Sequence, residues 1–169
     1  MTARAKFGHF QGSGLEVPGG VPHAASQYYN SAGCAFFFLD SSGYATGALD
    51  ASAGLAGWFT GVGFSPDSPD VTIDANGLAQ FLTSSTAATK YRSMMATPGD
   101  IFFCPSSAAY ALARLGELAD LTGSASNASA SRQRVILGTN ATDVVRVLGN
   151  ENIVDSTVYV QIYTWQADT

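Results

Sequence analysis

The stretch Thr157-Val-Tyr-Val-Gln-Ile-Tyr-Thr-Trp165 alternates aliphatic residues with aromatic and polar residues. Val158, Val160 and Ile162 fall on one side of an extended chain, because successive side chains of a β-strand point to opposite faces. Strict alternation over this length predicts a strand with one aliphatic face and one aromatic and polar face. Similar signals recur upstream, and together they predict a mostly β protein.

Other strand-sized apolar segments are bounded by turn residues. Residues 35–39 are continuously apolar and end at Asp40-Ser-Ser-Gly43, which predicts a buried strand followed by a turn. Residues 71–74 and 78–82 flank Asn76-Gly77, a pair that marks tight hairpins because it accepts positive φ angles. Further strands are predicted at residues 57–62, 101–104, 134–137 and 143–148.

Residues 107–121 contain the one pattern that resembles a helix. Leu112, Leu115 and Ala119 recur at helical spacing, whereas Gly116 argues against a helix. The segment is interpreted as a short helix or, alternatively, as irregular or strand structure. Short strands with frequent turns and at most one short helix predict an antiparallel β-sandwich or β-barrel.

The N-terminal residues 1–27 differ in character from the rest of the chain. They are rich in glycine, contain two prolines and show neither helical nor strand periodicity. We therefore expect an extended N-terminal arm that lies outside the packed core, followed by a single β domain at residues 28–169. The total length of 169 residues suits one domain.

Four arm residues are candidates for binding a partner. Arg4 and Lys6 are basic, Phe7 and Phe10 are aromatic, and residues 1–15 contain no acid. The arm is thus locally basic on an acidic protein, which suits docking onto an acidic partner surface.

Composition and charge exclude several classes of protein. The net charge is −5, only 12% of residues are charged, and no apolar run is long enough to cross a membrane. A general nucleic-acid binder needs a basic field, which this chain lacks. No signal peptide is predicted, because no apolar stretch follows the first basic residues, so we expect synthesis in a cytoplasm. Cys34 and Cys104 are accordingly interpreted as free, buried thiols.

Residues that carry catalysis or bind metals are sparse. Both histidines, His9 and His23, lie in the predicted arm, and the two cysteines lie in apolar strands where thiols are inert. The spacing of cysteine and histidine does not match a zinc site. Asp67, Asp70 and Asp74 do not follow the calcium-loop pattern. The sequence predicts no catalytic, metal or cofactor site, and no enzyme.

Four segments in the second half resemble a known family of proteins. They are Gly99-Asp-Ile-Phe-Phe103, Gly116-Glu-Leu-Ala-Asp-Leu-Thr122, Val145-Arg-Val-Leu-Gly149 and the terminal strand at residues 158–165. This order, across residues 99–165, resembles the decoration or cement proteins of tailed-bacteriophage heads.

The resemblance implies a non-enzymatic, mostly β protein on the outside of the virion. Such a protein binds the major capsid protein, bridges neighbouring capsid subunits and stabilises the head as a homo-oligomer, a trimer or a dimer. It is made in the host cytoplasm, and it contacts neither nucleic acid directly nor a membrane. Weak contacts repeated over a lattice supply affinity through multivalency.

Two alternative functions remain open from the sequence. One is another virion structural subunit, of the tail tube or of the head closure. The other is a carbohydrate-binding β-sandwich, in which aromatic side chains form a stacking platform. Its candidate residues are Trp58, Tyr91, Tyr159, Tyr163 and Trp165.

Overall fold

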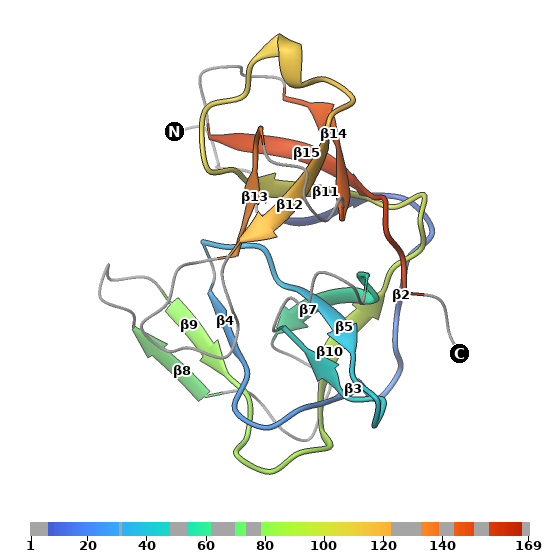
Figure 1. The fold of residues 1–169 in the computed structure, drawn as a ribbon. Coiled ribbons are helices and arrows are strands. Elements are labelled where there is room, and N and C mark those ends of the chain that lie inside the picture. The colour runs from blue at the N-terminus through green and yellow to red at the C-terminus, as the bar shows by residue number, and fades with distance from the viewer. Residues whose placement is uncertain are drawn as a thin grey trace.

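A computed structural model describes residues 7–30, 32–47, 54–61, 70–73, 79–122, 133–138, 144–150 and 156–166. Over these residues the protein is mostly β, with a six-stranded sheet, a closed five-stranded barrel and a three-stranded sheet (Figure 1). The predicted mostly β fold with at most one short helix is confirmed, and a barrel is present. No described helix has the length and hydropathy that a membrane span requires.

The three groups of strands are built from segments far apart in sequence. The six-stranded sheet has the order β1 (Gly8–Gln11), β11 (Ile101–Pro105), β15 (Thr157–Ile162), β14 (Val145–Gly149), β12 (Leu118–Thr122) and β13 (Arg134–Ile136). The barrel runs through β3 (Val21–His23), β6 (Ala45–Thr46), β5 (Phe36–Leu39), β7 (Gly57–Gly61) and β10 (Thr89–Met95), and β10 pairs with β7 to close it. β2 (Leu15–Glu16) also pairs with β10, and β4 (Tyr28–Asn30), β9 (Ala79–Leu82) and β8 (Asp70–Ile73) form the small sheet.

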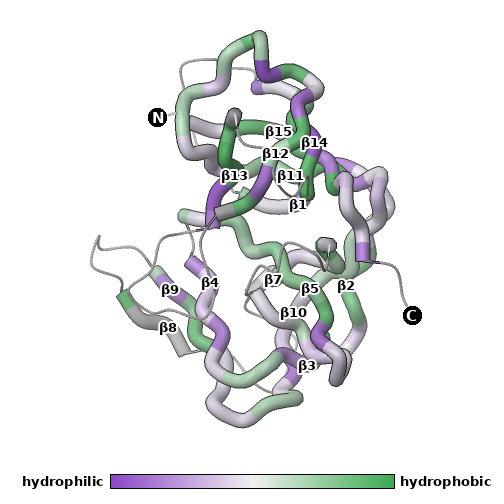
Figure 2. Tube along the Cα trace, in the orientation of Figure 1, coloured by the Kyte–Doolittle hydropathy of each residue, from purple (hydrophilic) through white to green (hydrophobic). Residues whose placement is uncertain are grey.

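Alternate residues of the barrel strands enter two different cores. Phe37 and Phe59 flank His23 inside the barrel, with centroid separations of 5.6 and 5.5 Å from its imidazole. Trp58, the neighbour of Phe59, lies on the other face of β7 and stacks on Phe102 of the six-stranded sheet at 5.3 Å. Residues 35–37 are buried at successive positions because both faces of β5 are covered. Figure 2 shows hydrophobic stretches along β5 and β15, the strands that contribute to these cores.

Most of the predicted strands are confirmed within a residue or two at each end. In β15 the burial alternates as the sequence pattern predicts, with the aliphatic residues buried. β8 and β9 pair antiparallel, as expected for the predicted hairpin, with Asp70 opposite Leu82. The predicted turn at Asn76-Gly77 lies outside the described residues. β10, the strand that closes the barrel, was not predicted from the sequence.

The helical interpretation of residues 107–121 is wrong apart from one turn of 3-10 helix, η1 (Leu112–Arg114), and the segment ends in β12. Gly116 has a φ of 80°, in the left-handed region that does not continue a right-handed helix. Leu112 and Leu115 are 74% and 58% exposed. Leu112 and Leu115 therefore cover no core, whereas Ala119 is buried as part of β12 and not on a helix face.

The prediction that the N-terminal arm lies outside the packed core is wrong for its described part, residues 7–27. β1 pairs with β11, while β2 and β3 both pair with β10. Val21 and His23 are 5% and 0% exposed. These strands are two to four residues long, too short to show a period, and they are stabilised by backbone pairing with longer strands.

Candidate functional site

A row of aromatic side chains lies on the face of the six-stranded sheet that points away from the barrel. Phe103 and Tyr159 are register partners on β11 and β15, and their ring centroids are 4.9 Å apart. Phe7 contacts Phe103 at 5.5 Å, and Phe10 contacts Tyr159 at 4.8 Å. Their sequence neighbours Phe102 and Val160 are fully buried, so alternation directs Phe103 and Tyr159 outward. We call Phe7, Phe10, Phe103 and Tyr159 the aromatic row.

Phe10 is the most exposed member of the aromatic row. The pairing of β1 with β11 is irregular between His9 and Gln11, so Phe10 occupies a β-bulge. Bulges re-aim side chains out of the regular ladder. The side chain is 59% exposed, although its ring still touches Tyr159. The bulge therefore presents an apolar ring to the outside of the molecule.

The same sheet face continues past the aromatic row into a cationic region. Tyr163 follows β15 and is 49% exposed, and the guanidinium of Arg146 lies 5.4 Å from the centroid of its ring. Gln161 lies between Tyr159 and Tyr163 and is the register partner of Arg146. β1, β11, β14 and β15 contain no aspartate or glutamate. The surface formed by the aromatic row, Arg146, Gln161 and Tyr163 is here called the outer face.

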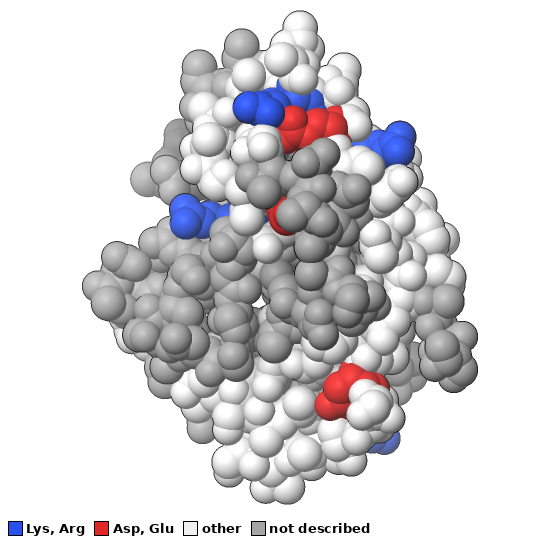
Figure 3. Space-filling view, viewed as in Figure 1, with Lys and Arg blue, Asp and Glu red and all other residues white. Residues whose placement is uncertain are grey.

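Charged side chains are also sparse elsewhere on the described surface. In the view of Figure 3, most described atoms belong to uncharged residues, and the charged ones form a few small groups. Among the described residues, ion pairs join Arg92 to Glu16 and Arg114 to Glu117. Burial of this surface against a partner therefore carries a small desolvation cost, because few charges would lose water.

The N-terminal segment is fastened to the body of the protein by one buried carboxylate. Asp100 is 0% exposed, and its Oδ1 accepts a hydrogen bond from the backbone N–H of Gly14 at 2.9 Å. The other oxygen accepts from the backbone N–H of Thr97 at 2.7 Å. His9 Nε2 lies 3.3 Å from Oδ1. These contacts hold residues 9–14 beside the turn that precedes β11, and so they place Phe10 on the outer face.

A second polar cluster occupies the interior of the barrel. His23 Nε2 lies 2.9 Å from Ser93 Oγ, and His23 Nδ1 lies 3.2 Å from the hydroxyl of Tyr29. Ser93 Oγ donates to the carbonyl of Tyr91 at 3.2 Å. If Ser93 gives its proton to that carbonyl, the imidazole must donate through Nε2 and accept the Tyr29 proton at Nδ1.

This arrangement of hydrogen bonds does not activate Ser93 as a nucleophile. A catalytic histidine has to accept the serine proton, whereas in this arrangement Nε2 would carry a proton and donate it to Ser93. Burial lowers the pKa of His23 to about 4 and raises that of Tyr29. All three side chains are at most 3% exposed. The cluster satisfies buried polar groups inside the barrel.

The structure brings together two of the four predicted arm residues. Phe7 and Phe10 join the aromatic row, whereas Arg4 and Lys6 lie outside the described residues. Asp100, which positions these residues through its contacts with His9 and Gly14, was not predicted as a site residue. The sequence feature that could have drawn attention to it is the turn Pro98-Gly99-Asp100. Both cysteines are free and buried, as expected.

The predicted aromatic platform for carbohydrate is divided between the interior and the surface. Trp58 and Tyr91 are 5% and 2% exposed and belong to the cores, so they cannot stack on a ligand. Tyr159 and Tyr163 lie on the outer face. Trp165 is 41% exposed, and its indole N–H donates to the carbonyl of Ala96 at 3.0 Å. Only the residues of β15 and its continuation are available at the surface.

Comparisons with protein-family models, with curated proteins and with solved structures find no match for this chain.

Proposed function

We propose that this protein is a capsid decoration, or cement, protein of a tailed phage. It binds the outer surface of the head and stabilises the shell by bridging major capsid subunits. The observation that carries the proposal is the outer face, where a partly exposed aromatic row lies beside Arg146 on strands without carboxylates. The resemblance of residues 99–165 to decoration proteins supports the same function.

The chemistry of the outer face suits a protein partner. Aromatic rings supply a large contact area with little loss of side-chain entropy, and aromatic residues and arginine are enriched among the residues that dominate binding energy. Phe10 and Tyr163 project furthest, at 59% and 49% exposed. Arg4 and Lys6 immediately precede the aromatic row in sequence. An acidic patch on the capsid would complement these cations and Arg146.

The proposed mode of action is repeated weak attachment without catalysis. A homo-oligomer, a trimer or a dimer, would engage several capsid subunits at once and gain affinity from effective concentration. The partners are the major capsid protein and other copies of the chain, with no direct contact to nucleic acid. The protein is made in the host cytoplasm and functions on the exterior of the virion.

The direct test is cosedimentation of the full-length protein with heads of the virus that encodes it. The wild type should sediment with the heads, and the double variant F10A/Y163A should bind at least tenfold more weakly. The control L112A removes an apolar side chain of similar exposure, 74%, from η1 outside the outer face. It should bind like the wild type. Failure of the wild type to bind, or equal binding by the double variant, would overturn the proposal.

Carbohydrate binding is a second candidate, which the half-buried Tyr159 and the exposed Tyr163 beside Gln161 and Arg146 favour. Sugars stack on aromatic rings and hydrogen-bond to amide and guanidinium groups. Titration of the protein with a panel of glycans, followed by the fluorescence of the half-exposed Trp165, tests this candidate. A saturable change that Y163A abolishes would support it, and no change across the panel would exclude it. Rings or tubes formed by the protein alone would instead favour a tail-tube subunit.

A further inference from the structure

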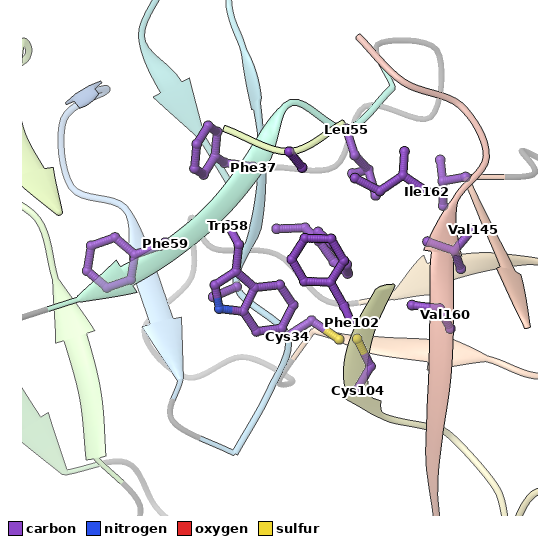
Figure 4. Packing of buried hydrophobic residues seen from close by; sticks show 14 of the residues in the cluster. Cys34, Phe37, Leu55, Trp58, Phe59, Phe102, Cys104, Val145, Val160 and Ile162 are labelled. Carbon is purple, nitrogen blue, oxygen red and sulfur yellow. The ribbon is translucent and has the colours of Figure 1, made fainter. Parts of the chain in front are cut away.

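The two cysteines meet where the barrel packs on the six-stranded sheet. Cys34 lies two residues before β5 of the barrel, and Cys104 lies within β11 of the sheet. Figure 4 shows their sulfur atoms facing each other beneath Trp58 and Phe102. The side chains are 2% and 0% exposed. A bond between them would join the two largest parts of the fold at their shared core.

The burial of both side chains keeps the two sulfurs out of contact with reagents in a reducing compartment. Burial and a hydrogen bond with the thiol of Cys34 raise the pKa of Cys104. A thiol without thiolate character attacks disulfides slowly. The pair is therefore stable as two thiols until the surrounding redox conditions change and the core opens transiently.

We propose that Cys34 and Cys104 form a redox-responsive dithiol that closes into a disulfide after the protein leaves the host cytoplasm, and so locks the barrel onto the six-stranded sheet. The timing rests on the proposed function, because a head released by lysis passes from a reducing to an oxidising environment. The pairing itself rests on the facing sulfurs and does not depend on that function.

The oxidant is a low-molecular-weight disulfide such as oxidised glutathione. One cysteine attacks it, forms a mixed disulfide and releases the first small thiol. The second cysteine then attacks the mixed disulfide, forms the Cys34–Cys104 bond and releases the second small thiol. The protein loses two protons and two electrons in total, and the oxidant gains both.

Closure should stabilise the fold because the bond spans 70 residues of sequence, from position 34 to position 104. A cross-link over a long loop restricts the unfolded chain more than one over a short loop. We expect the thermal midpoint to rise by about 5–15 °C. For a shell protein that resists internal pressure, a covalent join between the two halves of its core would slow mechanical unfolding.

The experiment uses the purified full-length protein, first reduced and then incubated with oxidised glutathione. Intact mass without reductant should fall by about 2 Da, titratable thiols in denaturant should fall from two to none, and a peptide map should join Cys34 to Cys104. C34A and C104A are the matched controls. Neither can form the bond, and neither should show the rise in thermal midpoint after oxidation.

The outcomes separate this inference from the proposed function. The incubation must be long enough for the core to open repeatedly. If the protein then still has two free thiols, or carries only glutathione adducts, the proposed Cys34–Cys104 disulfide is wrong. Because the primary measurement is made on the wild type, poor folding of a variant leaves the result intact. Cosedimentation of the reduced protein with heads tests the proposed function alone, and its failure would not alter the mass measurement.

Discussion

The Oδ1 atom of Asp100 accepts a hydrogen bond from the backbone N–H of Gly14, 86 residues earlier in the chain. This contact connects the N-terminal segment to the turn before β11, and the same carboxylate also orders that turn through Thr97. The close approach is possible only because Gly14 has no side chain. A Cβ there would lie 2.2 Å from Met94 Cε and 2.4 Å from Asp100 Oδ2.

Gly14→Ala should therefore detach or distort the N-terminal segment. Overpacking at a close contact typically costs about 1–3 kcal/mol, and the loss of the hydrogen bond to Asp100 would add to it. We expect a lower urea midpoint and faster hydrogen exchange of the β1 amides. The matched control is Gly99→Ala in the adjoining turn, where an added Cβ would meet nothing within 4 Å. Equal effects of the two substitutions would contradict the anchoring role of Asp100.

Protonation of His23 should destabilise the protein in mildly acidic solution. Burial lowers the pKa of His23 from 6.5 to about 4, so the unfolded chain binds a proton that the folded protein excludes. The contribution of neutral His23 to the free energy of unfolding is thus fully present above pH 6.5, and it is lost as the pH falls from 6.5 to 4. The full loss amounts to about 3 kcal/mol.

Urea unfolding of the wild type and of His23→Gln at pH 7 and pH 4.5 measures this contribution. The variant is less stable at pH 7 but should lack the His23 part of the pH dependence, because glutamine does not titrate. Carboxylates contribute to both proteins and cancel in the comparison. If the free energy of unfolding fell by the same amount between pH 7 and pH 4.5 in both proteins, His23 would not be the group responsible.

Two glutamine side chains substitute for strand partners of β5, and their loss should have unequal effects. The Gln133 amide accepts from the N–H of Phe36 at 2.9 Å and donates to its carbonyl at 3.3 Å. Gln166 makes the same pair of contacts with Leu39, at 2.6 and 2.7 Å. Phe36 is 0% exposed, whereas Leu39 is only partly buried.

Gln133→Ala should cost about 2–4 kcal/mol, because it leaves two buried peptide groups without partners. Gln166→Ala should cost about 1 kcal/mol, because water can reach the groups that it exposes. Equilibrium unfolding in urea gives both values. If Gln166→Ala lowered the free energy of unfolding more than Gln133→Ala, water would have less access to the peptide groups of Leu39 than the partial burial of this residue indicates.

The strands that could be predicted from sequence are those whose buried positions are all occupied by apolar side chains. β15 alternates valine and isoleucine with outward residues, and β5 is apolar at every position because both of its faces are covered. β10 was missed because it places Tyr91 and Ser93 inside the barrel and Lys90 and Arg92 outside. Because Ser93 is polar but points inward, the sequence of β10 does not alternate between apolar and polar residues. The hydroxyl of Ser93 contacts His23 inside the barrel.

The candidate site was only partly predictable for a related reason. Phe7 and Phe10 were identified because they are aromatic residues beside Arg4 and Lys6 in a glycine-rich segment without strand or helix periodicity. Their position depends on Asp100 and on the register of β1 with β11, and these contacts join residues more than 80 positions apart. No local pattern encodes such pairing. The segment therefore looked independent of the core although the structure builds it into both the sheet and the barrel.

Phe102 and Phe103 are adjacent in sequence but should differ sharply when replaced. Phe102 is 0% exposed and stacks on Trp58 with an interplanar angle of 17° (Figure 4). It also contacts Phe36, with ring centroids 4.9 Å apart. Phe102→Ala would open a cavity between the barrel and the six-stranded sheet, at a cost of about 3–5 kcal/mol. Phe103 contacts only the aromatic row among the described aromatic side chains, on a half-exposed face.

Phe103→Ala should therefore cost only about 1 kcal/mol in urea unfolding, since little of the core is disturbed. Its larger effect should be on cosedimentation with heads, because removal of the central ring separates Phe7 from Tyr159. Phe102→Ala protein that remains folded at low temperature should bind heads almost normally. The opposite result, with Phe103→Ala more destabilising and Phe102→Ala impaired in binding, would mean that the register of β11 differs by one residue and that its two faces are exchanged. Phe103 would then lie inside the protein, and the aromatic row would lack its central ring.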